Sequence, residues 1–181
     1  MKHALQTGWG RNLGMGSLAT LEWKGKRGML WSDLLQEALP KIRVTPPDIF
    51  MVHLAGNDLI LRKGKSLILQ VIPDFQTLRD MFPSMRLLWS NIIPRLVWQA
   101  DFKPGWIDRL RRGVNEIIGR AMRLGLGSVI PHPKLQGHWL ELFRSDGVLL
   151  SELVMDIFLK DPQGGIRAKI FGLDGGLGAY K

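Results

Sequence analysis

Residues 48–59, DIFMVHLAGNDL, join a short apolar run to a small polar segment. The run over residues 48–54 is rich in β-forming side chains and follows two prolines, which predicts a buried strand. The segment AGNDL, residues 55–59, then stands at the carboxyl end of that strand. Ligand sites of open α/β sheets lie at the carboxyl ends of strands. We therefore expect a functional site at residues 55–59.

Three residues of this segment suit such a site. Gly56 permits unusual backbone angles and the close approach of another group. Asn57 can aim a side-chain amide N–H at a developing negative oxygen, and Asp58 can fix the loop or cap the following helix. Gly-Asn-Asp is also ordinary turn chemistry, so a plain strand-to-loop turn is the alternative interpretation.

Strand-like and helix-like segments alternate on both sides of this stretch. That order predicts a parallel sheet with helices on both faces and right-handed crossovers. The Gly-rich end of the chain, residues 166–181, is expected to be a loose tail. The expected strands are residues 17–25, 48–54, 85–93 and 127–132, and the expected helices are residues 28–42, 65–82, 104–125 and 151–161.

Three segments, in their order along the chain, resemble motif blocks of the SGNH hydrolases, also called GDSL-type esterases and lipases. KGKRGMLWSDLL (24–35) resembles the second block, VHLAGNDL (52–59) the third, and FRSDGVLLS (143–151) the last. In detail the chain is most similar to SGNH-hydrolase-like domains that occur as many genomic copies, some of them tied to mobile elements. The likeness runs from residue 8 to residue 165, so we expect one such domain over residues 1–165.

The resemblance implies a fold and a set of site residues. The implied fold is a flavodoxin-like, three-layer α/β/α arrangement around a mostly parallel sheet. Gly28 and Asn57 take the positions of oxyanion-hole donors, with Gly56 and Asp58 in supporting positions, and Asp146 takes the position of the triad acid. The implied reaction is ester hydrolysis by acyl transfer on an acyl-ester small molecule, with no cofactor and no metal.

Two departures from the family pattern bear on activity. The family's nucleophilic serine belongs to a first block, Gly-Asp-Ser or Gly-His-Ser, which this sequence does not contain. The family's histidine base follows the aspartate by three residues, and that position is Leu149. Removing one triad member lowers turnover by roughly 10⁴- to 10⁶-fold. We therefore expect a catalytically impaired esterase-like domain, and whether it is an enzyme at all stays open.

The other histidines and serines offer few substitutes, because a serine nucleophile needs an imidazole within hydrogen-bond reach and a carboxylate behind it. His53, inside a strand, is interpreted as structural. His132, between two prolines at a strand end, is the candidate replacement base. Ser32, Ser90 and Ser151 are interpreted as helix-start, strand and capping residues.

The absent first block also carries the family's first strand, which is central in the flavodoxin-like strand order. Without it, the strands expected at residues 17–23 and 48–54 either pair directly or leave an open sheet edge. We therefore expect marginal stability and self-association through that edge, as in an N-terminally truncated or decayed copy.

The chain has 181 residues, a net charge of +9 and no cysteine. The positive charge supports an alternative function, a basic module that contacts nucleic acid in a mobile-element-derived protein, although a solvated basic surface is the simpler interpretation. The absence of cysteine excludes disulfides and thiolate metal sites. No apolar run is long enough for a signal peptide or a membrane span, so we expect no membrane contact and a cytoplasmic or nuclear location.

Overall fold

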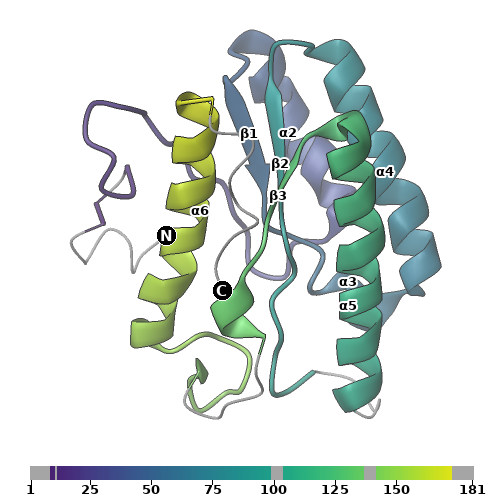
Figure 1. Ribbon diagram of the computed structural model, residues 1–181. Coiled ribbons are helices and arrows are strands. Elements are labelled where there is room, and N and C mark those ends of the chain that lie inside the picture. Colours follow the sequence, from purple (N-terminus) through teal and green to yellow (C-terminus); the bar gives the residue numbers. More distant parts are fainter. Residues whose placement is uncertain (1–8, 11, 99–103, 137–141, 173–181) are drawn as a thin grey trace.

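The computed structural model describes residues 9–10, 12–98, 104–136 and 142–172, which form a three-layer α/β/α fold (Figure 1). The alternation of strands and helices predicted from residue 48 onward is confirmed. In chain order the elements are α2 (Trp31–Val44), β1 (Ile49–Val52), α3 (Asp58–Leu61), α4 (Gly64–Met81), β2 (Arg86–Ser90), α5 (Pro104–Ala121), the π-helical turn η1 (Met122–Leu126), β3 (Ser128–Ile130), the 3₁₀ turn η2 (Pro133–Leu135) and α6 (Glu152–Ile170).

The sheet is parallel and has the strand order β1-β2-β3. Val52 lies opposite Trp89, and Ser90 lies opposite Ile130. All three strands therefore end at the same edge of the sheet. The loops that follow them at this edge include AGNDL, as the flavodoxin-like α/β class predicts.

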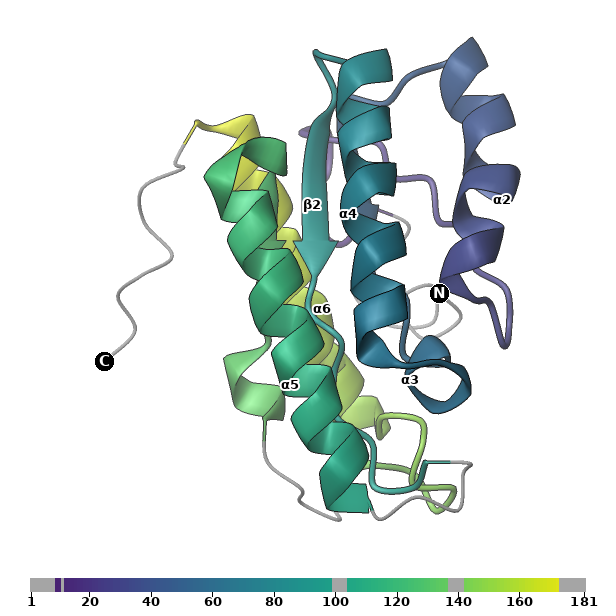
Figure 2. The ribbon, with the colours of Figure 1, turned by 90° about the vertical axis from the view of Figure 1, so that its right-hand side faces the viewer.

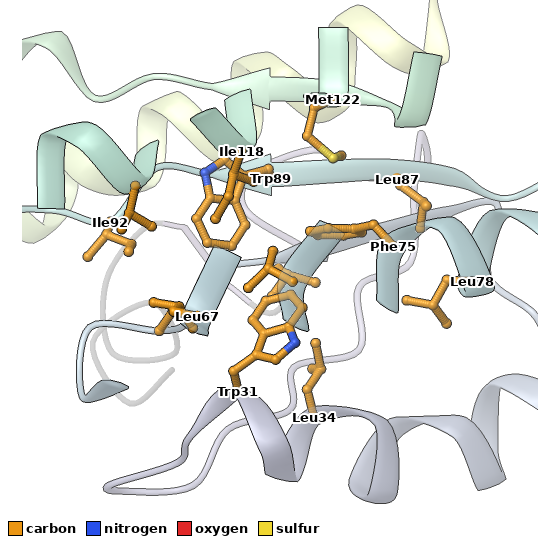
Figure 3. Close-up of a cluster of buried hydrophobic side chains, with 14 of the residues drawn as sticks. Trp31, Leu34, Leu67, Phe75, Leu78, Leu87, Trp89, Ile92, Ile118 and Met122 are labelled. Atoms are coloured by element: carbon orange, nitrogen blue, oxygen red, sulfur yellow. The ribbon is translucent and has the colours of Figure 1, made fainter. Parts of the chain in front are cut away.

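One face of the sheet is covered by α2, α4 and α5, and Figure 2 shows α4 between the other two helices. The apolar stripe of α4, which includes Leu67, Phe75 and Leu78, faces Trp31 of α2 and Trp89 of β2 (Figure 3). The ring centroids of Trp31 lie 5.5 Å from Phe75 and 5.9 Å from Trp89. This aromatic cluster fixes the N-terminal end of α2 against the sheet.

The opposite face is covered by α6 and by the segment from residue 9 to residue 23 (Figure 1). The strand predicted at residues 17–25 is wrong, because this segment pairs with no strand. Its alternating Ala19, Leu21 and Trp23 pack against the cluster that contains Leu88 and Leu159. The alternation of apolar and polar residues therefore reflects burial of one side of the segment. A β-strand also needs a neighbouring strand to hydrogen-bond with.

Helix α6 is longer than predicted. It continues through Pro162 to Ile170, so it crosses position 165, and residues 173–181 of the expected tail lie outside the described part of the chain. Gly165 explains how the helix stays on the sheet, because a Cβ at this position would lie 2.8 Å from the side chain of Ile130. The missing side chain lets α6 approach β3 closely, and Leu159 and Ile166 are buried in that contact.

The edge of the sheet beside β1 carries no further strand in the described residues, where β1 pairs only with β2. The direct pairing with residues 17–23 is thus not formed, and β1 is an edge strand of the sheet that the described residues form. Among the described helices, none combines the length and the apolar character that crossing a bilayer requires.

Candidate active site

The rim at the carboxyl ends of the strands brings two of the expected site residues together. Gly28, with φ of +73°, forms the turn before α2, and the carbonyl of the next residue, Met29, accepts a hydrogen bond from Asn57 Nδ2 at 3.1 Å. Asn57 Oδ1 accepts from both Nη1 and Nη2 of Arg95 at 3.2 Å each. One amide hydrogen of Asn57 is therefore committed to the protein, and the other is left for a ligand.

The backbone of the AGNDL loop is strained at Ala55 rather than at Gly56. Ala55 is buried and has φ of +77°, a conformation that costs an L-residue about 1–2 kcal/mol. Gly56 has a different task, because a Cβ there would lie 2.9 Å from Arg95 Nη2. Gly56 thus makes room for the Arg95 guanidinium that holds Asn57. The unusual backbone angle expected at Gly56 is found at Ala55 instead.

Asp58 joins the loop to α2. Its carboxylate is fully buried and accepts the backbone N–H of Trp31 at 3.0 Å, and Arg62 Nη2 lies 3.1 Å from its other oxygen. Burial raises the pKa of Asp58, and the Trp31 N–H and the Arg62 charge oppose that rise. The supporting position predicted for Asp58 thus corresponds to a structural tie between the second-block and third-block segments.

Asp146 stands in an exposed turn. Its Oδ1 accepts the backbone N–H groups of Val148 and Leu149 at 2.9 Å each, and these bonds lower the pKa of Asp146. Leu149, at the position of the family's histidine, is 54% exposed. In the described residues this carboxylate therefore orders a turn and orients no imidazole.

The turn of Asp146 nevertheless belongs to the same rim as Asn57. The carbonyl of Gly147 accepts the N–H groups of Leu96 and Val97, which directly follow Arg95 in the loop after β2. That loop thus lies between Asn57 and the last block. The sequence analysis missed Arg95, although its place just beyond the carboxyl end of β2 is a signal that could have found it.

A second group of polar side chains lies at the same ends of the strands, on the face that α6 covers. Ser90, the last residue of β2, has its Oγ 2.8 Å from His132 Nε2, and His132 Nδ1 lies 2.8 Å from Asp161 Oδ2 of α6. Ser90 and His132 are fully buried. His53 Nδ1 approaches the same Oγ at 2.9 Å from the other side.

Phe158 of α6 packs on both imidazoles, with ring centroids 4.8 Å from His53 and 4.8 Å from His132. As a residue His53 is exposed, although its imidazole packs against His132 and Phe158. Desolvation of the imidazole lowers the pKa of His53, and electrostatic interaction with His132 and with the Arg95 guanidinium lowers it further. His53 is therefore neutral at pH 7.

This serine–histidine–carboxylate row was only partly foreseen. His132 was the candidate replacement base, but Ser90 was interpreted as a plain strand residue and Asp161 as the last residue of a helix. The place of Ser90 at the carboxyl end of a predicted strand is a signal that could have found it, and in the structure Ser90 lies opposite Ile130, the last residue of β3. Asp161 could be found only with the full length of α6.

No protein-family model matches the sequence, and no curated protein matches it significantly. Solved structures do resemble the fold. A carbohydrate esterase family 3 protein from Talaromyces cellulolyticus has a TM-score of 0.64 at 18% identity, over 80% of this chain and 70% of that one. A family 3 carbohydrate esterase from Clostridium thermocellum has a TM-score of 0.61 at 16% identity, over 82% and 70%.

A GDSL-like lipase from Bacteroides thetaiotaomicron has a TM-score of 0.60 at 12% identity, over 78% of this chain and 73% of that one. These identities are too low to carry an activity from one protein to another. What the three structures share with this chain is the arrangement of its layers.

Proposed function

We propose, from the premise that this chain has an SGNH-hydrolase-like fold, that it is an esterase-type domain in which the family's hydrolysis is impaired. One observation carries the proposal. Asp146 Oδ1 accepts the backbone N–H groups of its own turn. The exposed Leu149 stands where the resemblance places the histidine base. Among the described residues no imidazole contacts that carboxylate, so the Asp146 position orients no base for a nucleophile.

The binding half of the rim supports a retained affinity for a carbonyl oxygen. Arg95 fixes Asn57, and Asn57 in turn meets the carbonyl of Met29 beside Gly28. These contacts fix the side-chain amide of Asn57, so its second amide hydrogen is held in place before any ligand binds. Such preorganisation is what an oxyanion donor needs. A small acyl ester is thus the ligand class that this rim would accept.

The test is hydrolysis of a short-chain nitrophenyl ester. The natural chain should show no enzymatic turnover, and neither should Leu149→His alone. A chain with Leu149→His and an added N-terminal strand ending in Gly-His-Ser should gain at least about a hundredfold over the same extended chain with Leu149. Leu153→His, at another exposed leucine, is the matched control and should gain nothing. Multiple turnovers by the natural chain would refute the proposal.

A second candidate function rests on the outer face of α5. Four exposed arginines follow one another at helical spacing, three on α5 and the last in η1, which continues it, and the exposed Glu116 interrupts the row: Arg109, Arg112, Arg120 and Arg123. Arg112 and Arg123 also line a hollow of about 280 Å³ together with the buried Arg111 and with Asn91. Such a row of guanidinium groups suits a phosphate backbone, so we propose nucleic acid as the alternative ligand.

Salt dependence distinguishes this alternative. Binding of a fluorescent single-stranded oligonucleotide should weaken steeply as the salt concentration rises. The double variant Arg120→Gln with Arg123→Gln should reduce the slope of log K against log salt concentration by about the equivalent of two phosphate contacts. Lys63→Gln with Lys65→Gln, which removes the same charge outside α5, is the control. Equal effects of the two pairs would indicate general attraction to a basic protein rather than a site on α5.

A further inference from the structure

With His132 neutral, the row of Ser90, His132 and Asp161 has one consistent order of protons. A neutral His132 must carry its proton on Nδ1, because that nitrogen faces the Asp161 carboxylate, which only accepts. His132 Nε2 is then an acceptor, so the Ser90 hydroxyl donates to it. The lone pair of Ser90 Oγ is left to accept the Nδ1–H of His53. Each hydrogen bond in the row is thereby satisfied.

This order of protons is the one that a serine nucleophile requires. The hydroxyl points at an unprotonated imidazole nitrogen, and a carboxylate fixes the tautomer of that imidazole and would stabilise its positive charge. The row arises from three separate elements, β2, the loop after β3, and α6. It differs from the rim in every residue, so it does not depend on Asp146 or Leu149.

Of the side chains packed around Ser90 Oγ, His53 is the exposed one and His132 is fully buried. Ser90 is fully buried, yet the imidazole that covers its Oγ belongs to His53, which is itself exposed. The only hydrogen bond that His53 makes within the described residues is the one to Ser90. Rotation of that ring away from Oγ would break this hydrogen bond and the ring contacts of His53 with Phe158 and His132.

We propose that Ser90 is a latent nucleophile, activated by His132 and Asp161 and covered by His53, which accepts a small acyl group from an activated ester. In the step, Ser90 Oγ bonds to the carbonyl carbon while its proton moves to His132 Nε2. The ester's oxygen then leaves with the bonding electron pair and takes that proton. The backbone N–H of Asn91 is already bonded to Ile130 O at 3.0 Å, so it gives no oxyanion contact. We therefore expect one slow acylation per molecule.

Diisopropyl fluorophosphate is a suitable probe, because its phosphorus is attacked by the same hydroxyl and fluoride leaves. Peptide mapping by mass spectrometry should find one adduct, on Ser90. His53→Ala should speed the labelling by at least about tenfold by uncovering Oγ, and Asp161→Asn should slow it by about tenfold to a hundredfold. Ser90→Ala should abolish the adduct. Ser84→Ala, which removes an exposed serine, should leave it unchanged.

Circular dichroism spectra should confirm that each variant is folded. The inference is overturned if folded natural chain and folded His53→Ala both stay unlabelled at Ser90. It is equally overturned if Asp161→Asn is labelled as fast as the natural chain, because the labelling rate of a serine that no base activates would not depend on Asp161. This inference does not rest on the proposed impairment of the rim. Ester turnover that survived Ser90→Ala would contradict the impairment alone.

Discussion

The rim and the buried row lie at the same end of one sheet and differ in what they preserve. At the rim, Gly28, Asn57 and Asp146 match positions in the SGNH-hydrolase blocks that the sequence resembles, but Leu149 stands where the resemblance places the base. The row of Ser90, His132 and Asp161 has no motif, but its distances are those of a nucleophile, a base and an acid. A motif and a working geometry are therefore separable properties, and each must be tested by itself.

His132→Ala should have the largest effect on stability. It removes one buried and one partly buried hydrogen bond and leaves a cavity where the imidazole was, so the free energy of unfolding should fall by about 3 kcal/mol in urea titration. Asp146→Ala at the exposed rim should cost far less. Similar losses for the two variants would contradict the contrast between a buried row and a solvated turn.

Ala55→Gly should stabilise the chain by about 0.5–1 kcal/mol, because glycine adopts the positive φ of this position without strain. The same titration measures the gain. The neighbouring exchange, Gly56→Ala, is the matched control and should destabilise, since its Cβ would crowd Arg95. Destabilisation by Ala55→Gly would contradict the positive φ of residue 55.

Asp58→Asn should have the smallest effect, visible as a change with pH. Because the pKa of Asp58 is raised in the folded state, the folded chain binds this proton more tightly than the unfolded chain does. The carboxyl's contribution to stability is thus complete below its ordinary pKa of 3.8 and declines as pH rises through the raised value.

An amide at position 58 does not titrate. The stability of Asp58→Asn relative to the natural chain should therefore improve as the pH rises from acid toward neutral. Denaturation series at several pH values measure this trend. A trend in the opposite direction would mean that the Trp31 N–H and Arg62 outweigh burial and lower the pKa instead.

The order of elements from β1 to α6 could be predicted from the sequence, because apolar spacing and prolines mark each of them. The strand at residues 17–25 could not be judged in this way, since alternation does not reveal whether a neighbouring strand exists. The rim was located by motif, but Arg95 was missed because it lies outside the three motif blocks and only its place just beyond the carboxyl end of β2 marks it. The row depends on Ser90, His132 and Asp161 meeting across long separations in sequence, which only the packing of α6 on the sheet reveals.

The absence of a side chain at Gly165 also bears on the interior row. A Cβ at this position would lie 2.8 Å from the side chain of Ile130, the last residue of β3. A larger residue would therefore hold α6 farther from β3, and Asp161 of the same helix farther from His132. The distance between base and acid is thus set by a residue that takes no part in the chemistry.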